Sequence, residues 1–263
     1  MIIKDYVIKR KQELKEEISK LGEKPCLVII QVNNDPASDA YVKGKLKDGA
    51  EVGANVILDK QAPSITQDDL IKLINQYNND PKVHGLIVQM PLPKHINENV
   101  IKLSVNPKKD VDGFHPMSTF SPCTPKGIID YLKSEKIEIL GKNAVVIGRS
   151  NIVGKPMQIL LRNESANVTQ LHSKTTRSDM EFYLAHADII VVAIGHKHFL
   201  DHNFKLKESA VIVDVGINRD ESGLHGDAEP NLKVRLQTPV PGGVGLLTRL
   251  TLLVNLLEAY HGI

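Results

Sequence analysis

The stretch DAYVKGK, residues 39–45, places a tyrosine hydroxyl and a lysine ammonium group four residues apart. If a helix begins at Ser38, a residue type that commonly caps a helix N-terminus, Tyr41 and Lys45 lie one turn apart on the same helical face. Both side chains could then point into one cleft, where a partly desolvated lysine can take part in proton transfer. Two nearby lysines project elsewhere and are expected to be surface charges: Lys43 and Lys47.

Two further segments supply polar groups that could act with this pair. VQMPLP contributes the amide of Gln89 just before two prolines, and KDVDGFHP contributes the carboxyl groups of Asp110 and Asp112. Taken singly, Gln89 could cap a strand edge, and either aspartate could form an Asx-turn before Gly113. Because each segment follows an expected strand, four side chains are predicted to meet at one edge of a sheet: Tyr41, Lys45, Gln89 and Asp112.

A third segment, GRSNIVGKPM, has small residues where a dinucleotide-binding fold needs them. Gly148, Ser150 and Gly154 follow the apolar run NAVVIG and open a helical pattern, so backbone N–H groups could approach phosphate oxygens. The spacing is a variant of the usual glycine pattern. A purely structural strand-to-helix turn is the alternative explanation.

The segment HSKTT follows the next apolar run and bears on the choice of nicotinamide cofactor. NAD-specific proteins usually carry an acidic residue at this point for the ribose hydroxyls, and none is present here. His172, Ser173 and Lys174 could instead donate to a 2′-phosphate, as could Arg149. The segment therefore favours NADP over NAD, although a solvated polar loop would have the same composition.

The positioning elements are predicted from apolar runs of strand length. In the first half these are CLVIIQV, ANVILD and GLIVQM, and stretches with helical spacing such as TQDDLIKLINQYNND lie between them. Continuous apolar strands joined by helices indicate a parallel βαβ sheet. A second series of the same kind follows, with runs at 143–148, 166–172, 187–195 and 209–216.

The two series are separated by DVDGFHPMSTFSPCTPKG, which is rich in proline, glycine and serine and is typical of a domain boundary. The last segment, GLLTRLTLLVNLLEAYHGI, has the apolar density of a packed helix and is expected to fold back onto the first domain. We therefore predict one domain from residues 1–118 and 246–263, and another from residues 119–245.

Composition narrows the classes of partner. The 33 basic and 31 acidic residues nearly cancel, which disfavours binding to nucleic acid or to an anionic membrane. No apolar run reaches the roughly 18 residues that a spanning helix needs, and the start of the chain is highly charged, so neither secretion nor membrane spanning is expected. The two cysteines lack metal-binding spacing and are too few for a disulfide framework. No metal site is predicted, and a reducing cytosol fits best.

The chain resembles the bifunctional methylenetetrahydrofolate dehydrogenase/methenyltetrahydrofolate cyclohydrolases through nine ordered blocks that cover nearly its whole length. They are DPASDAYVKGK…EVG, GLIVQMPLP, KDVDGFHP, PCTPKGI, VVIGRSNIVGKPM, HSKT, ADIIVVAIG, VIVDVGIN and TPVPGGVG. The resemblance implies an α/β fold of two domains, an N-terminal βαβ parallel-sheet catalytic domain and a Rossmann-type NADP-binding domain, with a cleft between them. It also implies oxidation of 5,10-methylenetetrahydrofolate by NADP⁺ and hydrolysis of the methenyl product to 10-formyltetrahydrofolate.

The same resemblance implies roles for the residues in these blocks. Tyr41 would line the folate site, Lys45 would act in catalysis, Gln89 would support that lysine, and Asp112 would hold the pterin through N3–H and the 2-amino group. Backbone at PGGVG would approach the ligand closely, which makes three more residues candidates for substrate binding: Pro241, Gly242 and Gly243. The cofactor contacts would come from Gly148, Arg149, Ser150, Ser173, Lys174 and Ile217. A cytoplasmic homodimer in one-carbon metabolism and purine biosynthesis is implied as well.

Some features depart from the family pattern. GGVGLLT stands where relatives read GGVGPMT, so Leu246 and Leu247 are expected beside the folate pocket and bear on its shape, and GDAEP stands where they usually read GDV. Three alternatives remain: a monofunctional dehydrogenase, a two-domain dehydrogenase of the shikimate type, and a nucleotide-binding regulator without turnover. Lys45 argues against the first, VQMPLP together with PGGVG against the second, and Lys45, Gln89 and Asp112 together against the third.

Overall fold

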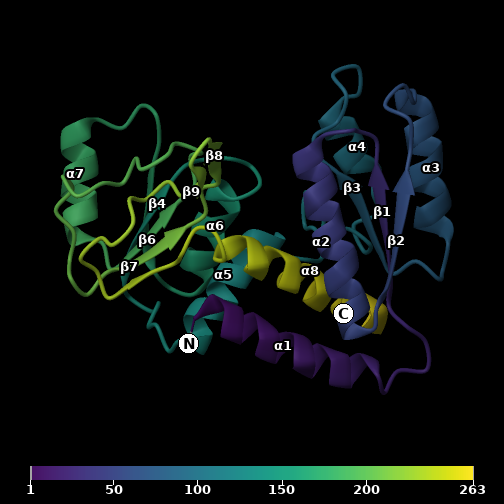
Figure 1. Ribbon diagram of the computed structural model, residues 1–263, viewed down its shortest axis with the longest axis horizontal. Coiled ribbons are helices and arrows are strands. Elements are labelled where there is room, and N and C mark those ends of the chain that lie inside the picture. Colours follow the sequence, from purple (N-terminus) through teal and green to yellow (C-terminus); the bar gives the residue numbers. More distant parts are fainter. Residues whose placement is uncertain (1, 263) are drawn as a thin grey trace. The chain divides into compact units, whose positions relative to one another are not determined.

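The computed structural model describes residues 2–262, and the chain folds into two compact units (Figure 1). One unit comprises the chain up to Val7 together with Thr124–Thr248, and the other comprises Ile8–Cys123 together with the chain from Arg249 onward. The sequence placed the divisions near 118 and 245, whereas the compact units divide after Cys123 and Thr248. Two long helices contribute residues to both units: α1 (Ile3–Ile18) and α8 (Val244–His261).

The unit that contains Ile8–Cys123 is built on a three-stranded parallel sheet. Its strands are β1 (Cys26–Gln31), β2 (Asn55–Lys60) and β3 (Gly85–Gln89), in the order β2-β1-β3. The central strand is buried throughout, as expected for an apolar strand that is covered on both faces. The βαβ parallel sheet predicted from the apolar runs is confirmed.

Helices cover both faces of this sheet (Figure 1). One face packs against α3 (Gln67–Asn79) and α4 (Glu98–Ser104), which bury Leu70, Ile74 and Ile101 among the strand side chains. The other face is approached by α2 (Pro36–Val52) and by α8. Gly49 of α2 allows this close approach, because a Cβ atom there would overlap the side chain of Val56 in β2.

The start of α2 corrects one detail of the sequence interpretation. Asp35, and not Ser38, is the N-cap residue, since the Asp35 side chain accepts a hydrogen bond from the backbone N–H of Ser38 at 2.8 Å. Pro36 occupies the first turn, where a missing N–H costs nothing. The shift does not alter the register of Tyr41 and Lys45, which still lie one turn apart.

The other unit is a Rossmann-type layer of five parallel strands. Their order is β10-β7-β6-β4-β5, and the strands are β4 (Asn143–Ile147), β5 (Asn167–Leu171), β6 (Ile189–Val192), β7 (Val211–Asp214) and β10 (Leu236–Gln237). The helices α5 (Cys123–Ser134), α6 (Gly154–Asn163) and α7 (Arg177–His186) contribute to its two apolar core clusters. A small hairpin of β8 (Asn218–Asp220) and β9 (Gly223–His225) completes the unit.

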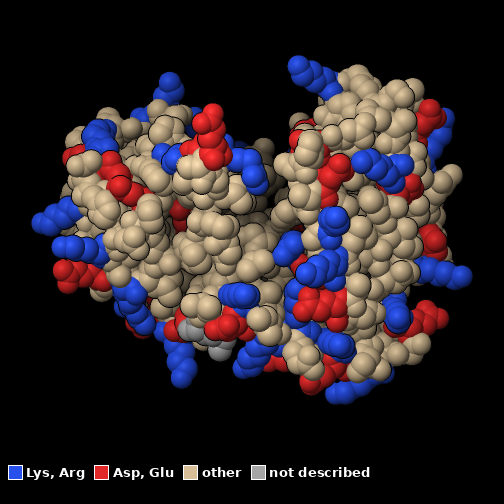
Figure 2. Space-filling view, viewed as in Figure 1, with Lys and Arg blue, Asp and Glu red and all other residues tan. Residues whose placement is uncertain are grey.

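The surface and the helices agree with the sequence composition. Lysine and arginine side chains alternate with aspartate and glutamate over the face shown in Figure 2, so no field of one sign covers it. Within residues 2–262 no helix combines the length and the apolar character needed to cross a bilayer. Both cysteines, Cys26 and Cys123, are buried free thiols.

Candidate active site

Lys45 of α2 lies within a cluster of polar side chains at the carboxyl edge of the β2-β1-β3 sheet. The lysine is only 5% exposed. Its Nζ donates to Oε1 of Gln89 at 3.2 Å, lies 3.7 Å from Oδ2 of Asp112, and lies 5.3 Å from the ring centroid of Tyr41. Three residues that the sequence predicted for this edge, Tyr41, Gln89 and Asp112, therefore surround the ammonium group of the fourth, Lys45.

The environment of Lys45 explains how the charge is tolerated. A buried ammonium group loses hydration, and an opposite charge and hydrogen-bond acceptors must replace it. Asp112 supplies the charge and Gln89 the acceptor. The Gln89 amide is itself oriented, because its Nε2 donates to the carbonyl of Met90 at 2.9 Å and leaves Oε1 facing the lysine. Since an ammonium group has three N–H donors, this geometry suits contact with a ligand as well.

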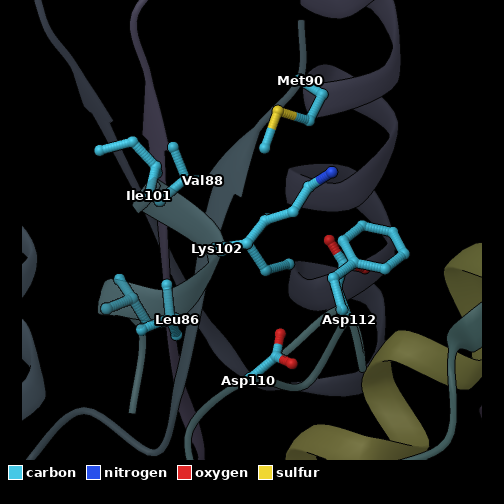
Figure 3. A pocket seen from close by; sticks show the side chains of 10 residues that line it. Leu86, Val88, Met90, Ile101, Lys102, Asp110 and Asp112 are labelled. Atoms are coloured by element: carbon cyan, nitrogen blue, oxygen red, sulfur yellow. The ribbon is translucent and has the colours of Figure 1, made fainter. Parts of the chain in front are cut away.

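Asp110 and Asp112 project from one loop and differ in their surroundings (Figure 3). Asp110 accepts a hydrogen bond from the backbone N–H of His115 at 2.7 Å. Burial raises the pKa of the Asp110 carboxyl group, and the nearby negative charge of Asp112 raises it further. Both carboxylates line a cavity of about 20 Å³, which has room for about one water molecule.

The helix that carries Tyr41 and Lys45 is also held by ion pairs of Asp48, a residue that the sequence did not indicate. Asp48 is 4% exposed and bonds Lys11 of α1 at 2.6 Å and Arg249 of α8 at 3.0 Å. The Arg249 side chain lies directly against Gly44, where any Cβ atom would overlap the guanidinium group. A glycine one residue before Lys45 thus lets α8 pack closely against α2.

A second network joins the strand ends to the start of α2. Gln31, at the end of β1, donates to Asp39 at 2.7 Å, and Asn33 donates to the carbonyl of Pro91 at 2.8 Å. Gln31 and Lys60 both donate to Asp39, which lowers the pKa of its carboxyl group. The Asn33 hydrogen bond connects the chain after β1 to residues 91–93, which follow Gln89. In the sequence, the only indication of these hydrogen bonds is that polar residues stand at the end of an apolar run.

In the Rossmann-type unit, the turn after β4 is as tight as the glycine spacing predicted. Gly148 has φ of 124°, a conformation that side chains rarely adopt, and a Cβ atom there would overlap the carbonyl oxygen of Ala193. A Cβ atom on Gly154 would overlap the backbone of Gly148. The Ser150 hydroxyl accepts from the N–H groups of Val153 at 3.1 Å and Gly154 at 3.2 Å, at the start of α6.

The donors expected to select the cofactor lie together on the edge of this sheet. Arg149 follows β4 and Ser173 follows β5, and a guanidinium N–H of Arg149 donates to the Ser173 hydroxyl at 3.4 Å. Arg149, Ser173 and Lys174 are exposed. In the same segment Thr176 caps α7 by accepting from Asp179 at 3.1 Å. HSKTT therefore presents basic and hydroxyl donors, without an acidic side chain, beside the turn that follows β4.

The remaining predicted site residues are all in this unit. Ile217 follows β7 and is 63% exposed. Pro241, Gly242 and Gly243 lie between β10 and α8, where Gly242 has φ of 91° and a Cβ atom on Gly243 would overlap the carbonyl of Pro239. At the departure from the family pattern, Leu247 is fully buried and Leu246 is partly buried.

Two buried aspartates that the sequence analysis did not assign hold the loops at this edge. Asp227 of the GDAEP segment accepts from the backbone N–H groups of residues 194, 195 and 196 at 2.7, 2.9 and 2.8 Å, and from the Asn218 side chain at 2.9 Å. Asp214 accepts from the N–H groups of Gly216, Asp227 and Ala228 at 2.8 to 3.0 Å. Together they fix the loops that follow β6 and β7.

The raised pKa of Asp214 leads to a prediction for how the stability of the fold depends on pH. Burial raises the pKa of its carboxyl group to about 6, above the value of about 3.9 expected in an unfolded chain. The folded state therefore retains a proton that the unfolded state has lost, and this stability is present below about pH 4 and is lost as the pH rises through about 6. The pH-dependent part should be about 3 kcal/mol.

We expect Asp214→Asn to remove this part of the pH dependence, even though the variant also loses hydrogen bonds at every pH. The measurement is urea unfolding of wild type and variant between pH 4 and 7.5. Asp220→Asn is the control, because the Lys197 and Ser222 hydrogen bonds lower the pKa of Asp220, so its contribution to the slope falls mainly below about pH 4 and the slope at higher pH should stay that of wild type. A difference between wild type and Asp214→Asn that is flat with pH would contradict the assignment.

Within residues 2–262, no group of three or more His, Cys, Asp or Glu side chains is arranged to hold a metal ion. Two polar clusters lie at the carboxyl edges of the two sheets. One offers a buried, paired lysine beside an aromatic ring. The other offers a tight glycine turn with exposed basic donors.

Two models of one protein family match this chain, and together they cover most of both units. The model of the tetrahydrofolate dehydrogenase/cyclohydrolase catalytic domain matches residues 3–112, and the model of the NAD(P)-binding domain of the same family matches residues 122–262. The bifunctional protein FolD of Bacillus subtilis is 47% identical over 255 residues, covering 91% of this chain and 89% of that protein. FolD of Streptococcus thermophilus is 45% identical over 262 residues, covering 93% and 91%.

Solved structures agree with the sequence comparison. The crystal structure of the bifunctional FolD methylenetetrahydrofolate dehydrogenase/cyclohydrolase from Campylobacter jejuni has a TM-score of 0.95 and 42% identity, and the alignment covers 98% of this chain and 96% of that one. FolD from Trypanosoma brucei, solved with NADP cofactor and an inhibitor, has a TM-score of 0.92 and 30% identity, with 99% and 97% covered.

Proposed function

The chain belongs to the tetrahydrofolate dehydrogenase/cyclohydrolase family, and from that premise we propose that it oxidises 5,10-methylenetetrahydrofolate with NADP⁺ and hydrolyses the methenyl product to 10-formyltetrahydrofolate. The observation that carries this proposal is the buried Lys45 ammonium group, held between Gln89 and Asp112 beside the Tyr41 ring. A nucleotide-binding regulator would have no need for a buried charge at this position.

Lys45 is the catalytic residue of the hydrolytic step. The methenyl carbon is already cationic, so its hydrolysis needs water and a group that moves protons at the reacting centre. Gln89 fixes the position of the ammonium group through its Oε1, and Tyr41 lies on the same helical face, where its flat ring can stack on the pterin. The helix geometry therefore places a stacking surface and a proton carrier one turn apart.

Asp112 orients the substrate. A carboxylate can accept two hydrogen bonds at once, and the pterin N3–H and 2-amino groups are two parallel donors. The rigid loop around Asp112 supports this role, because Gly113 has φ of 74° and packs directly against the backbone of residues 120–122. A fixed carboxylate sets the orientation of the ring relative to Lys45.

The cofactor site uses the Rossmann-type unit. When bound, NADP⁺ accepts the hydride that the methylene carbon gives up. The fit to this cofactor is supported by the close backbone approach at Gly148 and by the donor set of Arg149, Ser173 and Lys174. The oxidation step depends on the positioning of the two reacting rings more than on acid–base chemistry. Ile217, Pro241, Gly242 and Gly243 are proposed as further ligand contacts.

NADP⁺ is expected to be used in preference to NAD⁺. Each charge-assisted hydrogen bond to the 2′-phosphate is worth about 1.5 to 3 kcal/mol, or roughly one to two decades in affinity. Arg149→Ala should raise the KM for NADP⁺ by that factor and leave the KM for NAD⁺ nearly unchanged. Lys142→Ala, which removes a half-buried lysine just before the start of β4, at the opposite edge of the sheet, is the matched control. Equal or better turnover of wild type with NAD⁺ would refute the preference.

The function itself is tested by two assays on the purified chain. Reduced cofactor should form from methylenetetrahydrofolate with NADP⁺, and added methenyltetrahydrofolate should lose its absorbance faster than in buffer. If the wild-type chain forms reduced cofactor but does not accelerate methenyltetrahydrofolate hydrolysis, it is a monofunctional dehydrogenase.

We also propose that the chain acts in the cytoplasm as a homodimer and supplies 10-formyltetrahydrofolate for purine biosynthesis. The support is the family membership together with the absence, among the described residues, of a helix able to cross a membrane. Light scattering after size exclusion tests the assembly, and a mass near 29.1 kDa would contradict a dimer.

A further inference from the structure

Asn255 is a fully buried polar residue in the apolar helix α8. It is 0% exposed, and its neighbours in the helix include Leu252, Leu253, Leu256 and Leu257, all buried. An amide in such surroundings must form hydrogen bonds, because burying it without partners costs free energy. Its partners therefore indicate why a polar residue is placed here.

The Asn255 amide bridges two segments of the loop that carries Asp112. Its Nδ2 donates to the carbonyl of Val111 at 2.9 Å and to the carbonyl of Ser121 at 3.2 Å, and lies 3.7 Å from the sulfur of Cys123. The Cys123 thiol in turn donates to the same Val111 carbonyl at 3.2 Å. One side chain thus holds the residue just before Asp112 and the chain that returns beside it.

The two bridged segments have little freedom to move independently. The N–H of Cys123 donates to the carbonyl of Asp112 at 3.3 Å. A Cβ atom on Gly113 would lie 2.6 to 2.8 Å from backbone atoms of residues 120–122, so the two segments are in contact backbone to backbone. Any displacement of the returning segment would therefore be transmitted to Asp112.

We propose that Asn255 is a positioning residue for folate binding: its amide holds the Val111 and Ser121 carbonyls so that the Asp112 carboxylate keeps the orientation that binds the pterin. This role rests on the proposed function. The chemistry requires an N–H donor at this position, because Nδ2 lies against two carbonyl oxygens and a carboxylate in its place would repel them.

Asn255→Asp tests the role with almost no change in volume. When protonated, the new carboxyl group has one donor and can keep one bond, and when ionised it has none. The KM for methylenetetrahydrofolate should rise about 10- to 100-fold at pH 8, should rise less at pH 6, and the KM for NADP⁺ should stay near the wild-type value. Hydrogen exchange should become faster for amides of residues 111–123 and remain slow in β1–β3.

Ile74→Ala is the matched control, since it removes buried apolar volume from the same unit and leaves the hydrogen bonds of Asn255 in place. It should leave the folate KM independent of pH. Asn255→Ser, which keeps a shorter donor, covers the case in which the aspartate variant does not fold, and it should show a smaller rise in folate KM together with the same local exchange. Wild-type activity on folate is measured in parallel, because its absence would refute the proposed function and not the role of Asn255.

Two results would overturn the proposal. One is a wild-type folate KM at pH 8 in whichever Asn255 variant folds. The other is an equal, pH-independent rise in folate KM for the Asn255 variant and for Ile74→Ala, which would make the amide an ordinary contributor to stability.

Discussion

Lys45→Gln is expected to reduce the rate of methenyltetrahydrofolate hydrolysis by about 10²- to 10⁴-fold while measurable hydride transfer remains. Hydrolysis needs a group that moves protons near neutral pH. Hydride transfer can continue in a site that only holds two rings together. Glutamine keeps much of the length of lysine and can hydrogen-bond to Gln89, but it does not exchange a proton in this pH range. The expected loss corresponds to about 3 to 5 kcal/mol of activation free energy.

The measurement is a steady-state comparison of the two activities in wild type and variant. Lys43→Gln is the matched control, because Lys43 is on the same helix and is exposed, and it should leave both activities unchanged. Since Lys45→Gln also removes the counter-charge 3.7 Å from Asp112, the folate KM is determined as well. A variant that hydrolyses at the wild-type rate would remove Lys45 from the mechanism. Equal loss of both activities would make it a residue that positions substrate.

Asp112→Asn is expected to weaken folate binding by about 10- to 100-fold and to leave NADP⁺ binding nearly unchanged. The amide would present an N–H group to one of the two pterin donors and would lose a charge-assisted hydrogen bond. It would also leave the buried Lys45 ammonium group without its carboxylate. The effect should therefore be among the largest of any single substitution that preserves shape.

Titration of each ligand against wild type and variant measures this effect. Asp69→Asn provides the control for loss of one carboxylate, since Asp69 is exposed in the first turn of α3. Unchanged folate affinity in Asp112→Asn would show that the carboxylate does not contact the pterin. A matching loss of NADP⁺ affinity would show that the whole chain, and not the folate site, had been disturbed.

Much of the fold could be predicted from local pattern. Apolar runs such as CLVIIQV correspond to strands because a strand buried on both faces is apolar along nearly all of its length. The start of α2 was misplaced by three residues because Asp35 and Ser38 are both good capping residues, and it is the hydrogen bond from the Ser38 N–H to the Asp35 carboxylate that identifies the cap. The two-residue strand β10 and the β8–β9 hairpin carry no such run and depend on tertiary contacts.

The site could be predicted only in part, for a related reason. Tyr41, Lys45, Gln89 and Asp112 come from strand ends and one helical face, and parallel strands bring such positions together. Asn255 forms hydrogen bonds with residues more than 130 positions away in the sequence. The periodicity of α8 does not predict these contacts. The sequence does contain a signal for two of the missed residues: Asp214 ends a buried strand, and Asp227 follows a glycine.

The most direct test of the account is one reaction of wild-type protein with methylenetetrahydrofolate and NADP⁺, in which reduced cofactor and the methenyl species are followed by absorbance in the same trace. If Lys45 and its partners hydrolyse the intermediate in the chain that forms it, reduced cofactor should increase steadily while the methenyl species stays well below it. A methenyl signal that rises in equal amount with reduced cofactor, and decays only at the rate seen in buffer, would contradict the account.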